Sequence, residues 1–273
     1  LRAQGRHRAD EIRRMPYQFI QVQQDDHRTT ITLNRPESLN AINPPMHAEL
    51  EDAFNTFAAD DNAFLAVIRG AGRAFCAGSD LKAIATTGRV PYPKHGYAGL
   101  IERFDLAKPV IAAVDGYALG GGFEIALACD LIIATERSAF GLPEPLVGSV
   151  ALGGGLHRLA RQVGQKQAMG LILTAERIPA TEGFRLGFVN EVVAPEALDG
   201  AVDTWCTRIL RCAPLAIAAS KEAVMRGLDE PSLAAAMINQ SDYPAFSRHQ
   251  ASDDAIEGPR AFAEKRDPHW QGR

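Results

Sequence analysis

The 273-residue sequence predicts an α/β fold with a mainly parallel sheet, and three observations carry that prediction. Short apolar segments alternate with segments of helical periodicity through the first two thirds of the chain. Glycine turns separate several of the apolar segments from the helical segments that follow them. After Pro195 no segment has strand character, so we expect a helical C-terminal region.

The first segments alternate apolar and polar residues, as two paired strands do. Segments 17–22 and 29–33 flank a polar turn, which predicts a β-hairpin. Asn43 then precedes Pro44, an order typical of a helix N-cap followed by the first turn. One helical face of the next segment carries the apolar residues Met46, Leu50, Ala53, Phe54 and Phe57.

The middle of the chain repeats the order strand, glycine turn, helix. The expected strands are 64–69, 110–114, 131–134 and 189–193, and the expected helices are 123–129 and 156–173. Parallel neighbours need a crossover connection, which helices of this length supply. The repeat therefore favours parallel strands over hairpins in this part of the chain.

The last third is predicted to be helical and to serve assembly. Apolar residues recur at helical spacing from Leu198 to Ile209, and another helix is expected from Pro214 to Met225. We expect part of this apolar surface to pack on the core and part to face other subunits. The chain is thus divided into residues 1–14, a leader or an added extension, residues 15–195, the core, and residues 196–273, a helical oligomerisation region.

Composition excludes several classes of protein. The formal net charge of −4 lacks the basic excess of a nucleic-acid or anionic-membrane binder. The longest apolar stretch, 110–134, is interrupted by acidic residues, which argues against a membrane span. Four scattered cysteines indicate free thiols in a reducing compartment, so we expect a cytoplasmic protein. The histidines show no HExxH or HxxxH spacing, and no metal is expected.

Two glycine corners could present backbone donors to a ligand. Gly120, Gly121 and Gly122 stand between a strand and a helix, where backbone can approach a ligand closely and the first N–H groups are unpaired. The run is not a GxGxxG fingerprint, and tight packing is the alternative explanation. The other corner, which we call the first corner because it comes earlier in the chain, spans 75–82, with Asp80 as a helix cap. Two such corners could together form an oxyanion hole.

Two glutamates are candidate acid–base residues. Glu124 lies in the first turn of an apolar helix, where a carboxylate is costly unless it is paired or used. Stabilisation of the helix dipole is the alternative role. Glu144 lies between Pro143 and Pro145, which hold it in a fixed direction. If the two carboxylates converge, one becomes a proton donor and the other a proton acceptor.

In this order the motifs resemble the crotonase (enoyl-CoA hydratase/isomerase) family. They are Asn34-Arg35-Pro36 with Asn40-Ala41, and the segments 75–82, 109–124, 140–144 and 258–266. The resemblance runs from about Tyr17 to the C-terminus. It implies a spiral of ββα units followed by a helical segment that builds trimers, often stacked as hexamers.

The resemblance also implies an acyl-CoA thioester substrate, with CoA as part of the substrate and no other cofactor. Two backbone N–H groups, which match Ser79 and Gly121, would stabilise an enolate. The positions that match CoA contacts are Ser79, Asp80, Leu81, Lys82, Gly121, Phe262 and Lys265. In several members the tail positions approach CoA from a neighbouring subunit.

Hydratases of the family carry acids at both positions that match Glu124 and Glu144. The resemblance therefore favours reversible syn addition of water to a trans-2-enoyl-CoA, with Glu124 activating the water and Glu144 exchanging the α-proton. The chain is similar to enoyl-CoA hydratases and to carnitinyl-CoA dehydratases. Carnitinyl-CoA dehydratase, enoyl-CoA isomerase and a non-catalytic acyl-CoA-binding protein remain alternatives. Segment 148–158 departs from the run found in many hydratases, which leaves acyl-chain specificity open.

Overall fold

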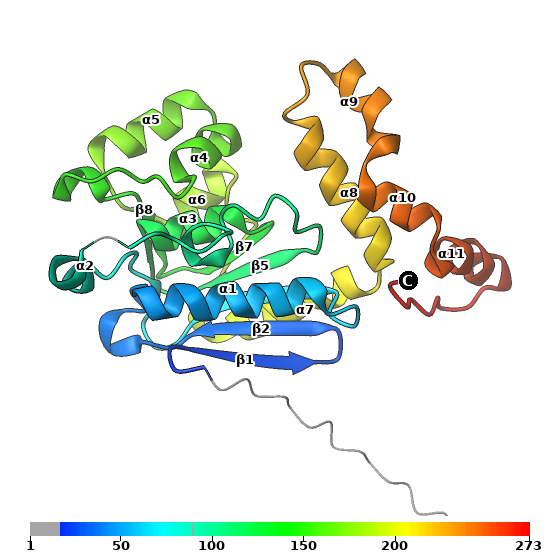
Figure 1. Ribbon diagram of the computed structural model, residues 1–273, viewed down its shortest axis with the longest axis horizontal. Coiled ribbons are helices and arrows are strands. Elements are labelled where there is room, and N and C mark those ends of the chain that lie inside the picture. The colour runs from blue at the N-terminus through cyan, green and yellow to red at the C-terminus, as the bar shows by residue number, and fades with distance from the viewer. Residues whose placement is uncertain (1–16, 89) are drawn as a thin grey trace, which may run out of the picture.

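A larger and a smaller sheet form the framework of the chain (Figure 1). The computed structural model describes residues 17–88 and 90–273, so the expected leader at 1–14 lies outside the described residues. The larger sheet has six strands in the order β1-β2-β3-β5-β7-β10, and the smaller has four in the order β4-β6-β8-β9. The predicted α/β class is confirmed.

The N-terminal hairpin and the first helix are confirmed. Strands β1 (Ile20–Asp25) and β2 (Arg28–Leu33) pair antiparallel around a two-residue turn in which Asp26 has a φ of 50°. Helix α1 (Pro44–Ala59) begins after Asn43, whose side chain accepts a hydrogen bond from the Met46 N–H at 3.0 Å. All five apolar residues expected on its inner face are buried.

The remaining strands of the large sheet run parallel. They are β3 (Leu65–Gly70), β5 (Val110–Val114), β7 (Leu131–Thr135) and β10 (Glu191–Val193). Helices α1 and α3 (Gly121–Ala128) belong to the main hydrophobic core, while α7 (Leu198–Leu210) packs on β3, β5 and β7 through a second cluster. Part of the C-terminal helical surface therefore covers the core, as expected.

The smaller sheet consists of short strands that the sequence did not indicate. They are β4 (Ala74–Cys76), β6 (Tyr117–Leu119), β8 (Ala139–Gly141) and β9 (Ile178–Pro179). Each of β3, β5 and β7 is followed by one of these strands and then by a helix, of which the first is α2 (Leu81–Thr87). This repeat gives the ββα units that the resemblance implied. Strands of two or three residues are too short to show alternation.

The expected long helix over 156–173 is wrong, because the structure has two helices there. Helix α4 (Gly155–Val163) and helix α5 (Gln165–Thr174) meet at Gly164, which has a φ of 87°. That conformation is easy for glycine and breaks the helical path. The apolar periodicity continues across the break, which explains the misassignment.

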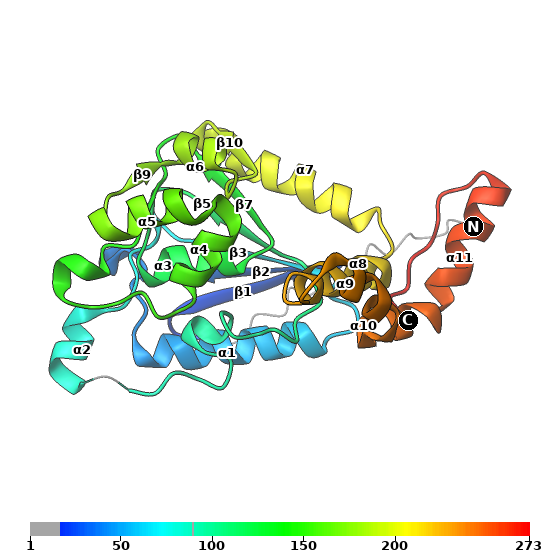
Figure 2. The same ribbon diagram turned by 90° about the horizontal axis from the view of Figure 1, so that it is seen from above.

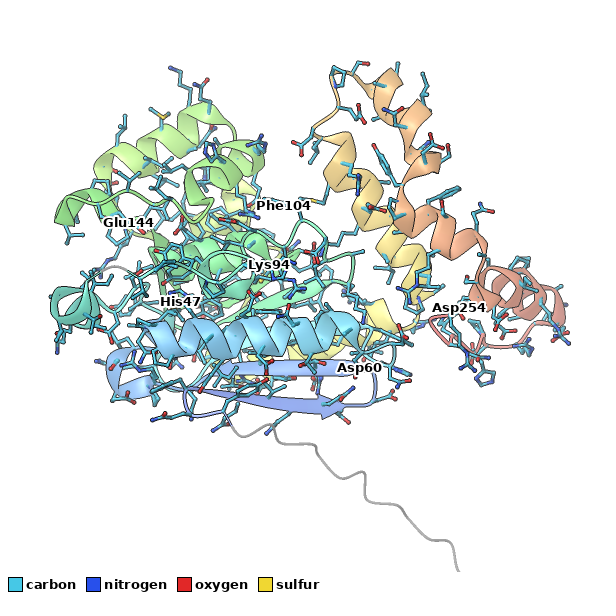
Figure 3. All side chains as sticks on the ribbon, in the orientation of Figure 1. His47, Asp60, Lys94, Phe104, Glu144 and Asp254 are labelled. Carbon is cyan, nitrogen blue, oxygen red and sulfur yellow. The ribbon has the colours of Figure 1, made fainter. Side chains whose placement is uncertain are left out.

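The chain ends in a group of helices that stands away from the sheets (Figure 2). After α6 (Ala180–Leu186) and α7 come α8 (Pro214–Gly227), α9 (Leu233–Asn239), α10 (Pro244–Gln250) and α11 (Asp253–Glu264). We call residues 214–273 the C-terminal arm. Figure 3 places Asp254, on α11, at the opposite side of the molecule from Glu144. Exposed apolar side chains on the arm are Val224, Met225, Leu228, Leu233, Met237, Ile238, Ile256 and Phe262.

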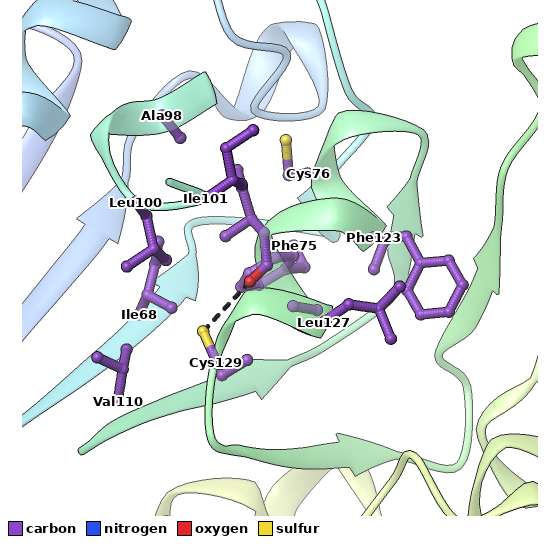
Figure 4. Close-up of a cluster of buried hydrophobic side chains, with 14 of the residues drawn as sticks. Ile68, Phe75, Cys76, Ala98, Leu100, Ile101, Val110, Phe123, Leu127 and Cys129 are labelled. Atoms are coloured by element: carbon purple, nitrogen blue, oxygen red, sulfur yellow. Dashed lines mark hydrogen bonds between the residues drawn. The ribbon is translucent and has the colours of Figure 1, made fainter. Parts of the chain in front are cut away.

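Helix α3 lies inside the main core rather than on a surface. Figure 4 shows Phe123 and Leu127 of this helix among buried side chains from β3, β4 and the segment before β5. Within the helix the Cys129 Sγ donates to the Ile125 carbonyl at 3.3 Å. Complete burial fixes the start of α3, which carries the glycine corner. No helix among residues 17–88 and 90–273 is long and apolar enough to cross a membrane.

Candidate active site

The candidate site forms where three short parallel strands end. In the small sheet Cys76 pairs with Ala118, and Leu119 pairs with Gly141. The carboxyl ends of β4, β6 and β8 therefore lie along one edge. A hydrogen bond of 2.9 Å from the Gly120 N–H to the Gly141 carbonyl extends this alignment past the strands. The residues that follow the strands are brought together here: the 77–80 turn, the glycine corner and Glu144.

The two glutamates lie close enough for the charge of Glu144 to act on Glu124. Glu124, in the first turn of α3, is 4% exposed and its Oε1 accepts the Gly155 N–H at 2.9 Å. Glu144 is half-buried and reaches across to the glycine corner, where its Oε1 would lie 2.7 Å from a Cβ added to Gly120. Glycine at 120 therefore leaves room for the carboxylate. Among the described residues the buried Oε2 of Glu144 has no hydrogen-bond partner.

Burial shifts the ionisation of both acids, and the charge of Glu144 adds to the shift of Glu124. The pKa of Glu124 is raised to about 7, with burial as the main cause and the nearby Glu144 charge acting in the same direction, while the Gly155 N–H and Arg158 oppose the shift. Burial also raises the pKa of Glu144. Two coupled carboxyls of this kind hold a proton into the neutral range. The pair can therefore present one acid and one base near pH 7.

The two predicted backbone donors lie on adjoining corners. A Cβ added to Gly78 would stand 3.2 Å from the Gly121 nitrogen, so the corners are in close contact. The Ile42 N–H donates to the Gly78 carbonyl, and the Ile42 carbonyl accepts the Asp80 N–H. The N–H of Ser79, which lies between these two residues, therefore points away from Ile42. Gly121 opens α3, where a helix has no internal acceptor. Neither N–H has an acceptor among the described residues.

A buried asparagine anchors the first corner. Asn40 is fully buried, and its Nδ2 donates to the carbonyls of Ala71 at 2.8 Å and Ala74 at 2.7 Å. Its Oδ1 accepts the Arg35 N–H at 2.9 Å. A buried amide with three hydrogen bonds fixes the chain just before β4 and at its first residue. The Asn34–Ala41 motif therefore positions the turn that carries Ser79.

Asp80 is engaged inside the protein. Its carboxylate caps α2 by accepting the N–H groups of Lys82 and Ala83, each at 3.1 Å, which confirms the predicted cap. It also pairs with Arg35 at 3.0 Å, and both side chains are only 14% exposed. The cap and this ion pair lower the pKa of Asp80, although burial alone would raise it. The carboxylate is thus committed to holding the turn. The backbone of Asp80 is engaged as well, because its N–H donates to the Ile42 carbonyl at 2.9 Å and its carbonyl accepts the Ile84 N–H at 3.0 Å.

Tyr97 is a site residue that the sequence reading missed. Its buried hydroxyl accepts from the Ser79 Oγ at 3.3 Å, and a Cβ on Gly121 would fall 2.3 Å from its ring. Its ring also meets His47 edge-on at 4.6 Å. Burial lowers the pKa of His47 to about 4, so the imidazole is neutral and its Nδ1 accepts the Ala98 N–H at 3.0 Å. Tyr97 therefore contacts both corners from a 3₁₀ turn, Tyr97–Gly99, that shows no sequence motif.

The other predicted contact residues lie apart from the acidic pair. Leu81 and Lys82 are exposed on α2, beside the first corner. Phe262 is 87% exposed on α11, and Lys265 ends that helix. Figures 1 and 2 place α11 at the far side of the arm from α2 and α3. Within one chain, Phe262 and Lys265 are not brought to the corners.

No metal cluster accompanies the site. Across residues 17–88 and 90–273 there is no group of three histidine, cysteine, aspartate or glutamate side chains arranged to hold a metal ion. The polar groups that converge are two carboxyls and two backbone N–H donors. That set suits proton transfer beside a developing oxyanion.

Known proteins resemble this chain over nearly its whole length. The family model of enoyl-CoA hydratase/isomerase matches residues 27–273. A carnitinyl-CoA dehydratase of Proteus mirabilis is 42% identical over 249 residues, which cover 89% of this chain and 94% of that protein. One from Citrobacter koseri is 43% identical, with the same coverage. The crystal structure of an enoyl-CoA hydratase from Mycobacterium tuberculosis has a TM-score of 0.87 and 39% identity, covering 93% of this chain and 99% of that chain.

Proposed function

The chain belongs to the enoyl-CoA hydratase/isomerase family, and we propose that it is a hydro-lyase that reversibly adds water to a trans-2-enoyl-CoA thioester. The addition is syn and gives a 3-hydroxyacyl-CoA. CoA enters as part of the substrate, and the reaction needs no metal or other cofactor. Two glutamates and two backbone N–H groups carry the chemistry.

The observation that carries this proposal is the buried acidic pair. Glu124 has its Oε1 bonded to a backbone N–H, whereas Glu144 has an Oε2 that no described group satisfies. An unsatisfied buried carboxyl oxygen costs about 1–3 kcal/mol, a cost that a reactive substrate atom can offset. Hydration needs both a base for water and an acid for carbon. Double-bond migration without water uptake needs only one of these groups.

The site supports a mechanism in which every proton has a place. The thioester oxygen accepts the N–H groups of Ser79 and Gly121, which stabilise the negative charge that develops there. Glu124 takes a proton from water as the water oxygen bonds to C3. The C2=C3 electron pair moves into the enolate, and Glu144 delivers its proton to C2. Proton exchange with solvent then restores the acid and the base.

The CoA portion is proposed to cross a subunit boundary. Asp80, Leu81 and Lys82 would line CoA from the first corner. Phe262 and Lys265 stand too far away within one chain, so their contribution would come from a neighbouring subunit of a trimer or hexamer. We keep residues 15–195 as the catalytic core and 196–273 as the assembly region. The cysteines are free thiols, in keeping with a cytoplasmic protein.

A second candidate is the hydration of an enoyl-CoA that carries a quaternary ammonium, as in carnitinyl-CoA dehydration. Relatives bearing that name are 42% and 43% identical to this chain. The rings of His47, Tyr92 and Tyr97 are adjacent to the first corner, but their centroids are only 4.6–5.4 Å apart. Rings this close leave no space between them for a trimethylammonium group. A cation would have to be recognised outside this cluster.

The test is the loss of absorbance of the conjugated enoyl thioester, measured on short, long, aromatic and crotonobetainyl CoA esters. The proposal expects hydration of at least one ester, with the 3-hydroxyacyl product verified by mass. Preference for the crotonobetainyl ester would establish the second candidate. Migration of a 3-enoyl-CoA double bond without water uptake would identify an isomerase. Tight binding across the panel without turnover would contradict any enzymatic role.

A further inference from the structure

Arg158 spans two segments that meet behind the acidic pair. It lies on α4 and is half-buried. Its Nη2 donates to the Ile101 carbonyl at 2.6 Å, and its guanidinium lies 5.9 Å from the centre of the Phe104 ring. The backbone N–H of Arg158 donates to the Gly154 carbonyl at 2.8 Å. Arg158 therefore ties the start of α4 to the 97–104 segment.

Each of the two joined segments supports a different half of the site. The start of α4 supplies the Gly155 N–H that bonds Glu124. The 97–104 segment carries Tyr97, which backs the Ser79 and Gly121 corner. The spacing between the acid–base pair and the oxyanion donors consequently depends on the contact between these segments. Arg158 makes a charged hydrogen bond at that contact, a stronger tie than a neutral one.

The charge of Arg158 faces the acidic pair. Glu124 is influenced by Glu144 from the turn after β8 and by Arg158 from α4, and its charge acts on Tyr97 from the 97–104 segment. The pKa of Arg158 is in turn influenced by the charges of four groups: Cys129, Glu124, Arg161 and Glu102. Burial lowers the pKa of this guanidinium, but an arginine remains protonated throughout the working range. The guanidinium and the Glu124 carboxylate also flank the same backbone: a Cβ added to Gly154 would lie 2.2 Å from the Arg158 Nη1, and one added to Gly153 would lie 2.5 Å from the Glu124 Oε2. A fixed positive charge therefore lies near a carboxylate that must ionise.

We propose that Arg158 is a positioning residue for hydration, which favours the ionised form of Glu124 as the base and holds the acid–base pair at a fixed distance from the two backbone donors. The assignment deepens the proposed function and rests on it. Arg158 does not touch the reacting atoms. It acts through the carboxylate of Glu124 and through the 97–104 backbone.

Two variants separate the charge from the geometry. Arg158→Met keeps much of the length and removes the charge, whereas Arg158→Lys keeps the charge and loses the planar fork. For Arg158→Met we expect the acid limb of the pH profile of kcat/KM to move up by about one unit, as loss of a nearby opposite charge requires. We also expect kcat to fall at least tenfold with a smaller change in KM. Arg158→Lys should keep the limb of the wild type with a reduced kcat.

Arg161→Met is the matched control, because Arg161 lies on the same helix with its side chain 63% exposed. It should keep both the limb and the rate. Thermal unfolding of each variant reports whether the fold survives. An unmoved acid limb in Arg158→Met, or a displaced limb in Arg158→Lys, would overturn the proposal. Either result would leave Arg158 with a packing role.

A second readout does not depend on turnover. The Glu124 carboxyl can be titrated by ¹³C NMR in wild type, Arg158→Met and Arg158→Lys. The titration should move upward in the methionine variant and stay in place in the lysine variant. If the wild type hydrates no enoyl-CoA, the proposed function fails, while this titration still decides whether Arg158 governs Glu124. An unchanged titration in the methionine variant would refute the inference.

Discussion

The corner of the fold that carries the candidate active site and the C-terminal arm are both incomplete, in opposite ways. The corner holds polar groups that have no hydrogen-bond partner among residues 17–88 and 90–273: the N–H groups of Ser79 and Gly121, and the buried Oε2 of Glu144. The arm exposes large apolar side chains, such as Leu228 at 68% and Ile238 at 73%. Unsatisfied buried polar atoms indicate a polar ligand, whereas exposed apolar surface indicates another protein. We therefore propose that substrate completes the first region and that other subunits complete the second.

The two regions also differ in how they are held. The corner starts on α3, which lies within the main core, so its geometry is fixed by packing. The arm is fastened at its end: Asp254 accepts the N–H groups of Gln271 and Gly272, and the Trp270 indole donates to the Arg211 carbonyl at 2.9 Å. Damage to the arm should therefore leave the corner intact. The reverse should hold as well.

Gly121→Ala breaks the corner alone and should lower turnover strongly. The new Cβ would stand 2.3 Å from the buried Tyr97 ring, so the donor at 121 must move. Loss of one oxyanion donor lowers kcat by about 10²–10³. Hydration assays should show this fall, while the solution mass stays the same. Gly200→Ala is the control, since nothing lies within 4 Å of its added Cβ. Near-normal turnover in Gly121→Ala would contradict the oxyanion role.

Glu124→Gln measures how much the buried Glu124 carboxylate lowers the free energy of unfolding. The folded pKa of Glu124 is about 7, above its ordinary value of 4.5. Its contribution to stability is thus full below pH 4.5 and is lost as the pH rises through 7. Glutamine removes this loss, so the variant should gain stability over wild type by about 2 kcal/mol more at pH 8 than at pH 5. Urea unfolding at both pH values checks the difference. An equal effect at the two pH values would argue against a raised pKa.

Leu228→Asp combined with Met237→Asp breaks the arm alone. Both side chains are exposed and apolar, and a charge placed in a subunit interface is costly unless it is paired. The solution mass, measured by light scattering, should fall to that of one chain. The KM for acyl-CoA should rise by roughly tenfold, the loss of one or two contacts, with a smaller change in kcat. Gln250→Asp, at an exposed polar position of the arm, is the control. An unchanged mass would remove these residues from the interface.

Local chemistry made part of the fold and site predictable. The caps at Asn43 and Asp80, the burial of the α1 face and the position of Glu124 on α3 each follow from neighbouring residues. Other features depend on contacts distant in sequence. Tyr97 reaches Gly121 across the fold, and Arg158 reaches Ile101 from a later helix. The helix break at Gly164 was hidden because apolar spacing continues through it.

The central claim is that Glu144 supplies a proton to the substrate carbon. Glutamine at 144 keeps the size of the side chain and cannot give up a proton in this way. For Glu144→Gln, the hydration rate of crotonyl-CoA should fall by about 10²–10⁴, the contribution of a general acid. The thermal midpoint should be close to that of the wild type. Hydration near the wild-type rate by a correctly folded Glu144→Gln protein would contradict the claim.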